Sequence, residues 1–361
     1  MLTARELNRA TLARQMLLAR EAVSVPAAVE RLAGMQAQEP KHPFIGLWTR
    51  VDGFGAATLR DAISSRDVVR ATLMRSTLHL VSAADYVALR VSLQPPMSVA
   101  LRVLGARAEG LDPERVLPAA RELLAGRPRT FDAIRAGLQE RFPEVNDRAL
   151  GYATRTLLPL VMMPGRDDER WGFPRVGEFA LAEELLGREL GPSAPEALVR
   201  RYLAAFGPAS AADVQTWSGV SGLKKVVDGM RGELELFADE RGRELFDLPG
   251  SPRPGAEVPV PARFLPEFDN LVLAHDDRSR LIADAHRPRV TTKNLRVRAT
   301  FLVDGVVAGT WTIAVKRGLA TLTLEPFAKL AARAAKELRA EGEALLGFAE
   351  PDARGHEVVV A

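Results

Sequence analysis

Two glutamines, Gln36 and Gln38, stand one residue apart in the stretch GMQAQEP, where an apolar helical pattern ends. An amide side chain is not a base at neutral pH, but its oxygen accepts hydrogen bonds and its nitrogen donates them. A pair of amides can therefore orient a water molecule and stabilise a positive centre, provided that the substrate is already prone to react. The plain alternative is a solvated helix end, and the pair alone does not decide between the two.

Basic residues on three predicted surface elements form a second group of candidates, for contacts with nucleic acid. They are Arg70, Arg75 and His79 in the predicted β-hairpin RATLMRSTLHLV, Lys224 and Lys225 on a predicted helix, and Arg296, Arg298, Lys316 and Arg317 at the ends of a second predicted hairpin. A hairpin with such side chains could follow phosphates or enter a groove, and a helix-turn-helix touches its duplex through its second helix. Solvated faces and protection of a sheet edge explain the same residues without any nucleic acid.

A dense polar cluster occurs in the stretch LPEFDNLVLAHDDRSRLI. Its members stand between apolar positions and are Asp269, Asn270, Asp276, Asp277 and Arg278. Paired carboxylates could perform acid–base chemistry. The mixture of both charges with an amide favours turns and salt bridges instead, so we predict a structural role for this cluster.

Composition excludes several classes of chemistry. The chain has no cysteine, which excludes disulfides, thiol catalysis, zinc fingers and iron–sulfur clusters. The five histidines are scattered. His275 and His286 flank acidic residues, but their separation of eleven residues is no recognised ligand spacing, so we expect no metal site. No nucleophile elbow, phosphate-binding loop or dinucleotide fingerprint occurs in a suitable context, so no cofactor is expected.

The charge is permissive of nucleic-acid binding without requiring it. The net charge is +3, and of the 49 basic residues seven are lysine and 42 are arginine. Arginine suits phosphates and base edges better than lysine does, although a GC-rich genome also supplies arginine in excess.

No apolar run approaches the roughly 20 residues that span a bilayer, and the N-terminal stretch lacks the features of a secretory signal. We therefore expect a cytoplasmic protein.

One order of predicted elements occurs three times along the chain. The copies comprise helices at 4–19, 24–38 and 57–65 with a strand pair in 68–82; helices at 130–142 and 147–163 with a hairpin tip at 164–176; and a helix at 196–207, a helix-turn-helix at 210–230 and a hairpin at 234–248. Ser24 and Pro26 are typical of a helix start, and Gly219 and Gly222 of the turn in a helix-turn-helix. Helices followed by a two-stranded hairpin are the layout of a winged helix, so three tandem winged-helix motifs are predicted.

The last third of the chain has a different pattern. A proline-rich stretch at 251–263 is typical of a linker. Strand formers alternate over 295–318 around Asp304-Gly305, a strong hairpin signal, and a strand at 320–326 and a helix at 326–346 follow. We predict an α+β protein with winged helices at 1–94, 95–190 and 191–254, and a C-terminal β-rich segment with a hairpin and a terminal helix at 255–361.

Five stretches, taken together and in this order, resemble the AlkZ/YcaQ-like winged-helix DNA glycosylases. They are LAGMQAQEPKHPFIGLW, VVRATLMRSTLHLVSAADY, GPASAADVQTWSG, LPEFDNLVLAHDDRSR and VDGVVAGTW. The resemblance implies three winged helices stacked into a C-shaped, DNA-binding body. It also implies excision of N7-alkylated purines, in some members from interstrand crosslinks made by DNA-alkylating natural products, hence antibiotic self-resistance. Its Gln–x–Gln catalytic motif falls on Gln36 and Gln38, and its DNA-approaching hairpin is mapped to the ribbon around VDG.

The resemblance turns the glutamine pair into a mechanistic hypothesis. An N7-alkylguanine is cationic, so its glycosidic bond is already polarised, and two amides suffice to hold a water and stabilise an oxocarbenium-like sugar. We predict a monofunctional glycosylase that acts as a monomer on double-stranded DNA with alkylated purines, without a cofactor. Two alternatives remain open: a winged-helix DNA-binding regulator without catalysis, and a protein-interaction scaffold.

Overall fold

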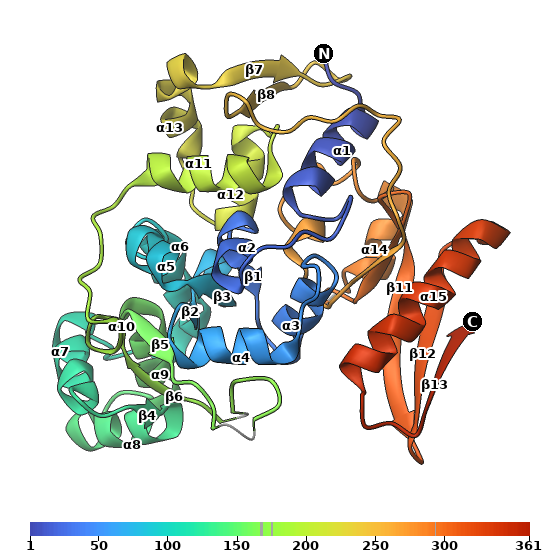
Figure 1. The fold of residues 1–361 in the computed structure, drawn as a ribbon. Helices are drawn as coiled ribbons and strands as arrows, with labels where there is room; N and C mark the ends of the chain where they lie inside the picture. The colour runs from blue at the N-terminus through green and yellow to red at the C-terminus, as the bar shows by residue number, and fades with distance from the viewer. Residues whose placement is uncertain (167–168, 175, 293) are drawn as a thin grey trace.

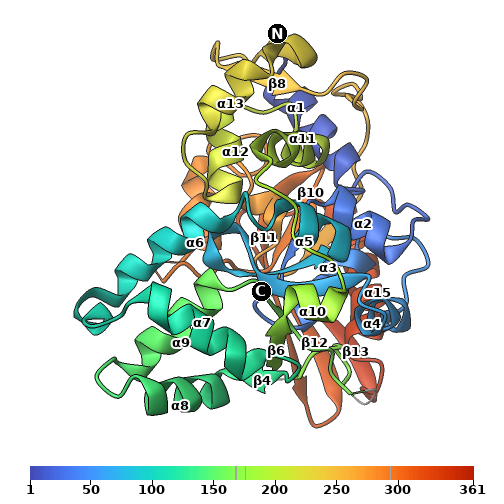
Figure 2. The same cartoon turned by 90° about the vertical axis from the view of Figure 1, so that its left-hand side faces the viewer.

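The computed structural model describes residues 1–166, 169–174, 176–292 and 294–361 and has the predicted α+β class. The strands within these ranges form three sheets. A six-stranded sheet has the order β1-β3-β2-β5-β6-β4, a five-stranded sheet the order β13-β12-β11-β10-β9, and β7 and β8 pair alone. In Figures 1 and 2, helices α11–α13 lie above α5 and α6, and the helices α7–α9 lie below them. Figure 1 shows the five-stranded sheet with α15 to one side of these helices.

The first predicted motif ends its second helix earlier than expected. Its elements are α1 (Ala4–Arg14), α2 (Val25–Arg31), β1 (Met35–Gln36), α3 (Lys41–Trp48), α4 (Ala56–Ser64), β2 (Val68–Thr72), the 3₁₀ turn η1 (Met74–Ser76), β3 (Leu78–Ser82) and α5 (Ala83–Leu89). Ser24 caps α2 as predicted. The predicted continuation to Gln38 is wrong, because Ala33 and Gly34 take φ values of 53° and 82° and turn the chain. Gln36 therefore lies in a strand, opposite His79 of β3.

The second predicted motif shares its sheet with the first. Its elements are α6 (Gln94–Ala100), η2 (Leu101–Ala108), α7 (Pro113–Leu124), β4 (Arg129–Thr130), α8 (Phe131–Arg141), α9 (Asp147–Leu157), β5 (Leu160–Met162), β6 (Glu178–Leu181) and α10 (Ala182–Leu186). The helix predicted to reach position 163 stops at Leu157, because Pro159 disfavours helical backbone at Leu158. The hairpin tip predicted at 164–176 lies partly outside the described residues. Pairing of β2 with β5 joins the two motifs.

The third predicted motif has the expected helix-turn-helix and hairpin. Its elements are α11 (Pro195–Phe206), α12 (Ala211–Ser218), α13 (Leu223–Gly229), η3 (Arg231–Glu233), β7 (Glu235–Ala238) and β8 (Glu244–Asp247). Gly219 and Gly222 adopt φ values of 78° and 79°, which side chains rarely allow, and so make the turn between α12 and α13.

The order helix, strand, helix, helix, strand, strand occurs in all three copies, with an isolated bridge between Ala209 and Phe246 as the first strand of the third. This order is consistent with three winged helices, while the limits of the motifs stay a prediction. The cores cross those limits. One buried apolar cluster runs from α2 to β6, and a second joins β2, β3 and α5 to α11–α13.

The C-terminal segment forms the five-stranded sheet, with α15 packed on one face (Figure 1). Its elements are β9 (Arg263–Leu265), η4 (Asn270–Val272), η5 (Asp284–His286), α14 (Arg287–Val290), β10 (Thr300–Val303), β11 (Val306–Lys316), β12 (Leu319–Pro326), α15 (Ala332–Ala349) and β13 (Gly355–Val360). The helix predicted from 326 thus begins at Ala332.

The hairpin turn predicted at Asp304-Gly305 is present but is not a free tip. The Asp304 carboxylate lies 2.7 Å from the Arg5 guanidinium. A Cβ added to Gly305 would meet Leu12 of α1 at 2.5 Å, so the turn is packed against that helix. The Asp304-Gly305 turn is therefore not the free end of the ribbon to which the DNA-approaching hairpin was mapped, and the mapping to this ribbon stays a prediction. The exposed tip lies at the other end of β11, where Arg317 and Gly318 connect it to β12.

A buried ion pair attaches α1 to the third predicted motif. The Arg14 guanidinium and the Asp247 carboxylate, both essentially inaccessible, lie 2.7 Å apart, and Arg14 also donates to the Leu203 carbonyl. Low-dielectric surroundings make the loss of one partner costly, because the other charge then remains buried without compensation.

We expect Asp247→Ala to lower the free energy of unfolding by about 3–5 kcal/mol, because Arg14 then loses its counter-ion. Urea denaturation followed by circular dichroism measures this change. Glu337→Ala, which breaks the exposed pair with Arg333, is the control and should leave stability unchanged. Equal effects of the two substitutions would contradict the role given to the buried pair.

Candidate active site

Gln36 is a buried residue whose amide is held in place. Its side chain is 7% exposed, and its Oε1 accepts a hydrogen bond of 3.0 Å from Arg75 Nη2. The same guanidinium donates to Asn270 Oδ1 at 3.2 Å, while Asn270 Nδ2 donates to the Gly34 carbonyl at 3.0 Å. A solvated helix end therefore does not describe Gln36.

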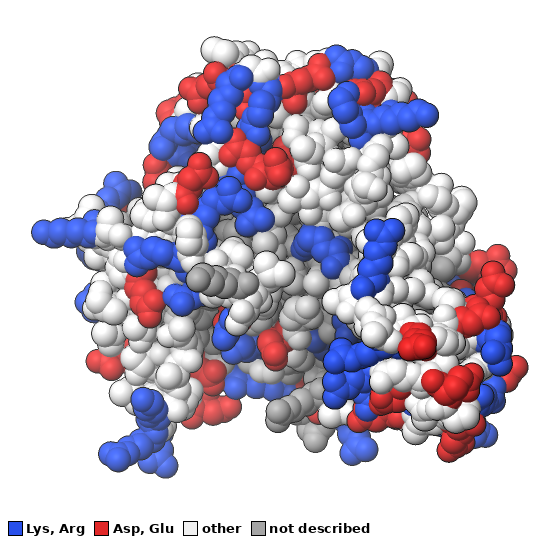
Figure 3. Space-filling view, turned by 180° about the vertical axis from the view of Figure 1, so that it is seen from behind, with Lys and Arg blue, Asp and Glu red and all other residues white. Residues whose placement is uncertain are grey.

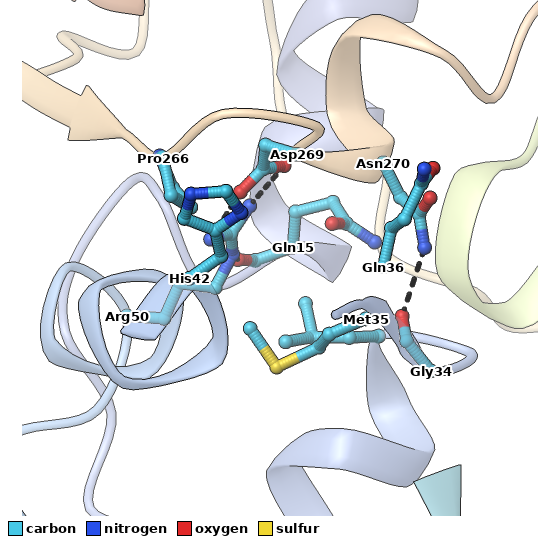
Figure 4. Close-up of a pocket in the computed structure, with 10 residues that line it drawn as sticks. Gln15, Gly34, Met35, Gln36, His42, Arg50, Pro266, Asp269 and Asn270 are labelled. Atoms are coloured by element: carbon cyan, nitrogen blue, oxygen red, sulfur yellow. Dashed lines mark hydrogen bonds and ion pairs between the residues drawn. The ribbon is translucent and has the colours of Figure 1, made fainter. Parts of the chain in front are cut away.

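A small cavity lies beside Gln36, with room for about one water molecule. Ten residues line it, and Figure 4 shows Gln36 and Asn270 together at one end and His42 at the other. The ion pair of Arg50 and Asp269 forms part of its wall. A fixed amide next to a water-sized space is an arrangement that can orient a water.

Gln38 faces a second and much larger space. The half-buried Gln38 lines a cleft of about 860 Å³, within the size range of pockets that bury a small ligand. The cleft wall also contains apolar and aromatic side chains and both charges, namely Ile45, Trp171, Phe268, Trp311, Ile313 and Val315 with Glu39, Lys41, Glu267, Arg296 and Glu350. His42 and Pro266 line both spaces, so the cavity of Gln36 and the cleft of Gln38 are neighbours.

Arg70 supports the backbone that carries both glutamines. Its Nε donates to the Ala37 carbonyl at 2.8 Å and its Nη2 to the Gln38 carbonyl at 2.9 Å. Burial lowers the pKa of Arg70 to about 10, so it stays cationic at neutral pH. Arg70 was predicted on a wing surface, whereas the structure shows it 4% exposed and fastened to the Gln–x–Gln stretch.

The exposed wing predicted for Arg75 and His79 is not found. His79 lies in β3 between β1 and β2 and is fully buried, with Nδ1 3.0 Å from the Thr77 carbonyl oxygen. Arg75 turns inward, where its guanidinium donates to the Trp217 carbonyl as well as to Gln36. Packing of the third motif and the C-terminal segment over this hairpin is the physical reason, since both supply acceptors to Arg75.

The other predicted DNA contacts are exposed but scattered. Lys224 and Lys225 lie on α13, where Lys224 pairs with Asp228 at 2.6 Å. Arg298 is half-exposed and 3.8 Å from Glu325, and Lys316 and Arg317 occupy the β11–β12 tip. Figure 3 shows Lys and Arg side chains around a hollow in the middle of one face, with much of the acidic surface toward its borders.

The polar cluster at 269–278 has mostly the structural contacts that its composition favours. Asp269 pairs with Arg50 through both carboxylate oxygens at 2.9 Å, and Asp277 lies 2.8 Å from Arg243. The backbone N–H of the exposed Asp276 donates to Asp213, and Arg278 donates to the His275 carbonyl. Asn270 is the exception, because its amide belongs to the network around Gln36.

Titratable side chains at this site keep one protonation state near neutral pH. Burial lowers the pKa of His42 to about 4 and that of His79 to about 3, so both imidazoles are neutral. Burial, with a smaller effect of Arg278, lowers the pKa of Arg75 to about 10, so this guanidinium remains charged. Within the described ranges, no three His, Cys, Asp or Glu side chains gather as a metal site. His275 instead contacts the Phe206 carbonyl oxygen, and His286 packs on Phe327.

Comparison with known proteins places this geometry in a family. A family model described as DNA glycosylase AlkZ-like matches residues 29–348. The chain belongs to the AlkZ-like DNA glycosylase family. It is accordingly a DNA glycosylase, as the resemblance predicted, and the alternatives of a regulator or a scaffold fall away.

A curated protein and a solved structure, both from Streptomyces sahachiroi, agree with this assignment. An interstrand DNA cross-link repair glycosylase is 26% identical over 327 residues, which cover 83% of this chain and 85% of the relative. The solved structure of the DNA glycosylase AlkZ matches with a TM-score of 0.81 at 22% identity, covering 100% of both chains, and so has the same fold. In the parts of the chain that the structure describes, no helix is long and apolar enough to cross a membrane.

Several residues of the site were missed or misplaced from sequence. The local sequence around Arg50 does not indicate its pairing with Asp269, and the sequence around Asn270 does not indicate its bond to Gly34. In both cases the partner lies more than 200 residues away in the chain. His42 follows the Gln–x–Gln stretch by four positions, and that proximity was the one available signal for its place in the site.

Proposed function

We propose that this glycosylase removes N7-alkylated purines from double-stranded DNA by hydrolysing the N-glycosidic bond, with Gln36 and Gln38 positioning the water. The observation that carries the proposal is the buried amide of Gln36, fixed by Arg75 beside a water-sized cavity that adjoins the cleft of Gln38. The enzyme acts as a monomer and uses no metal or cofactor.

The chemistry suits amides because the substrate supplies its own activation. The bond between the sugar C1′ and the base N9 breaks, and its electron pair neutralises the cationic N7-alkylpurine as it leaves. Water then adds its oxygen to the oxocarbenium-like C1′ and loses a proton to solvent, which leaves an abasic sugar. Gln36 and Gln38 accept hydrogen bonds from that water and place their dipoles toward the positive sugar, so no strong acid is needed.

The neutral state of the neighbouring imidazole fits a cationic substrate. His42 lines both the cavity and the cleft, and its pKa of about 4 keeps it uncharged when the substrate binds. A second positive charge there would oppose both the cationic base and the developing oxocarbenium. Among the carboxylates around the cleft, Glu267 pairs with Arg296 and Glu350 with Arg170, whereas Glu39 has no such partner in the described structure and favours a positive ligand.

The size of the cleft supports bulky adducts as substrates. A crosslinked or bulky base cannot easily be turned through 180° into a narrow pocket, as base flipping requires. A cleft of about 860 Å³ at the rim of the glutamine pair accepts a lesion without that rotation. The curated relative is named for interstrand crosslink repair, and we propose crosslinked purines as further substrates of this chain.

The direct test incubates the protein with duplex DNA that contains N7-methylguanine, followed by alkaline cleavage of abasic sites. We expect strand breaks from the wild type, and a loss of about 10²–10³-fold in single-turnover rate for Gln36→Ala and for Gln38→Ala. Gln139→Ala removes a half-buried amide far along the chain, whose nitrogen donates to the Phe142 and Pro143 carbonyls, and serves as control. Full activity of both site variants would refute the catalytic role of the pair.

The rate should be independent of pH between about pH 6 and about pH 8. The pKa values of His42 and His79 lie well below this window and those of Arg70 and Arg75 well above it, so none of these groups changes charge there. Below about pH 5 the rate should fall as His42 gains a proton and a positive charge. Single-turnover rates across the range measure this, and a slope near one log unit per pH unit inside the window would indicate a general acid or base instead.

The exposed β11–β12 tip should contribute to DNA affinity through Lys316 and Arg317. In the double variant Lys316→Ala/Arg317→Ala, we expect the slope of log affinity against log salt to decrease by roughly 0.9 for each phosphate that the tip no longer neutralises. Lys329→Ala/Arg333→Ala removes the same charge near the start of α15 and should leave the slope closer to that of the wild type. Fluorescence anisotropy with an undamaged duplex measures both, and identical slopes for the two variants would remove the tip from the interface.

A further inference from the structure

Arg75 occupies a backbone conformation that arginine rarely adopts. It lies in the turn between β2 and β3 with φ of 53° and ψ of 23°, followed by Ser76 with φ of 59°. A left-handed conformation at a residue with a side chain is strained and persists where the surrounding structure enforces it. Here it carries the guanidinium inward, between the first motif, the third motif and the C-terminal segment.

The hydrogen bonds around Arg75 fix the direction of two amides. A guanidinium has only donors, so the atoms that face it must be oxygens, Oε1 of Gln36 and Oδ1 of Asn270. The orientation of the Asn270 amide is also fixed by its nitrogen. Nδ2 donates to the Gly34 carbonyl oxygen, which can only accept a hydrogen bond. Among the described residues, Arg75 is the one side-chain partner of Gln36. Removing Arg75 would leave this amide free to rotate or flip.

Arg75 is also a cation without a counter-ion in the described structure. Its three acceptors, the side-chain oxygens of Gln36 and Asn270 and the Trp217 carbonyl, are all neutral, and no carboxylate of the described chain lies within ion-pair distance. The buried Arg14 and Arg50, in contrast, each pair with a carboxylate. Partly desolvating Arg75 without an opposite charge is unfavourable, which suggests a role for this residue beyond stabilising the fold.

We propose that Arg75, braced by Asn270, is a positioning residue for glycosidic-bond hydrolysis: it sets the orientation of the Gln36 amide. The second lone pair of Oε1 then remains available to the water, and the amide needs no reorientation when the sugar becomes positive. This inference rests on the proposed function and adds to it that the Gln–x–Gln motif works only with a donor from outside the motif. Arg75 acts through Gln36 and does not contact the reacting atoms.

A double-mutant cycle between Arg75 and Gln36 tests this inference under single-turnover conditions. Arg75→Met should lower the rate about 10–100-fold and change the dissociation constant for the lesion duplex less than about threefold. Arg75→Lys, which retains one donor, should recover part of the loss. Arg75→Met added to Gln36→Ala should lower the rate no further, because the amide that Arg75 orients is already gone. The proposal would be overturned if the rate losses of Arg75→Met and Gln36→Ala multiplied in the double variant. It would also be overturned if Arg75→Met changed only the affinity for DNA.

Arg66→Met is the matched control, because Arg66 has the same left-handed conformation and also donates to a distant carbonyl, that of Leu185. Arg66 touches neither glutamine, so the rate of Arg66→Met should equal that of the wild type. A loss like that of Arg75→Met would overturn the proposal.

If circular dichroism shows that Arg75→Met does not fold, Asn270→Ala provides the same test. It should give a smaller rate loss, and this loss should also be absent in the Gln36→Ala background. An inactive wild type on N7-methylguanine DNA would refute the proposed function, whereas multiplying effects in an active enzyme refute only this inference.

Discussion

The buried ion pair between Arg50 and Asp269 is the contact on which the site depends. It joins Arg50, two positions after α3, to the segment after β9, with Nη1 and Nη2 of the guanidinium each 2.9 Å from a carboxylate oxygen. Arg50 also donates to the Gln15 and Gly46 carbonyls, so the first motif holds it rigidly. Because Asn270 follows Asp269 in the chain, this ion pair positions the Asn270 amide within hydrogen-bond distance of Gly34 and Arg75. Such a pair adds specificity of arrangement more than net stability, since desolvation offsets much of its Coulomb attraction.

The site is assembled from segments far apart in the chain. Gln36 comes from β1, Arg75 from the β2–β3 turn, Asn270 from the C-terminal segment, and the Trp217 carbonyl from the end of α12. Each of these contacts is modest by itself, and together they give one amide a single orientation. Stacking of the motifs therefore does more than provide a surface for DNA. A lone winged helix would contain both glutamines and Arg75, yet it would lack Asn270 and the Trp217 carbonyl, which accept the other hydrogen bonds of Arg75.

Local chemistry explains what could be predicted from sequence. The turn at Gly219 and Gly222, the cap at Ser24 and the hairpin at Asp304-Gly305 each depend on a few neighbouring residues, and all three were predicted. By contrast, the local pattern predicts a helix at the position of β1, and this prediction is wrong. The two residues of β1 are extended because they pair with β3, whose residues lie some forty positions further along the chain. The inward position of Arg75 was missed for a similar reason: its acceptors in Trp217 and Asn270 are 142 and 195 positions away. The two catalytic candidates were found by resemblance, and their burial and support were not.

Amides as catalytic groups place a demand on the fold that acids and bases do not. A carboxylate or imidazole takes part by gaining or losing a proton, whereas an amide contributes only a dipole, whose effect depends on its direction. In water that dipole would reorient freely and have little effect on the barrier. Gln36 is only 7% exposed and accepts a hydrogen bond from Arg75, so its amide cannot reorient freely before the substrate arrives. The cavity beside it has room for about one water molecule. In the proposed mechanism, neutral imidazoles nearby leave the amide dipoles and the surrounding carboxylates as the groups that respond to a positive sugar. If the substrate is the proposed cationic lesion, two amides are sufficient, and the same reasoning predicts that an unmodified purine, which lacks this activation, stays in the DNA.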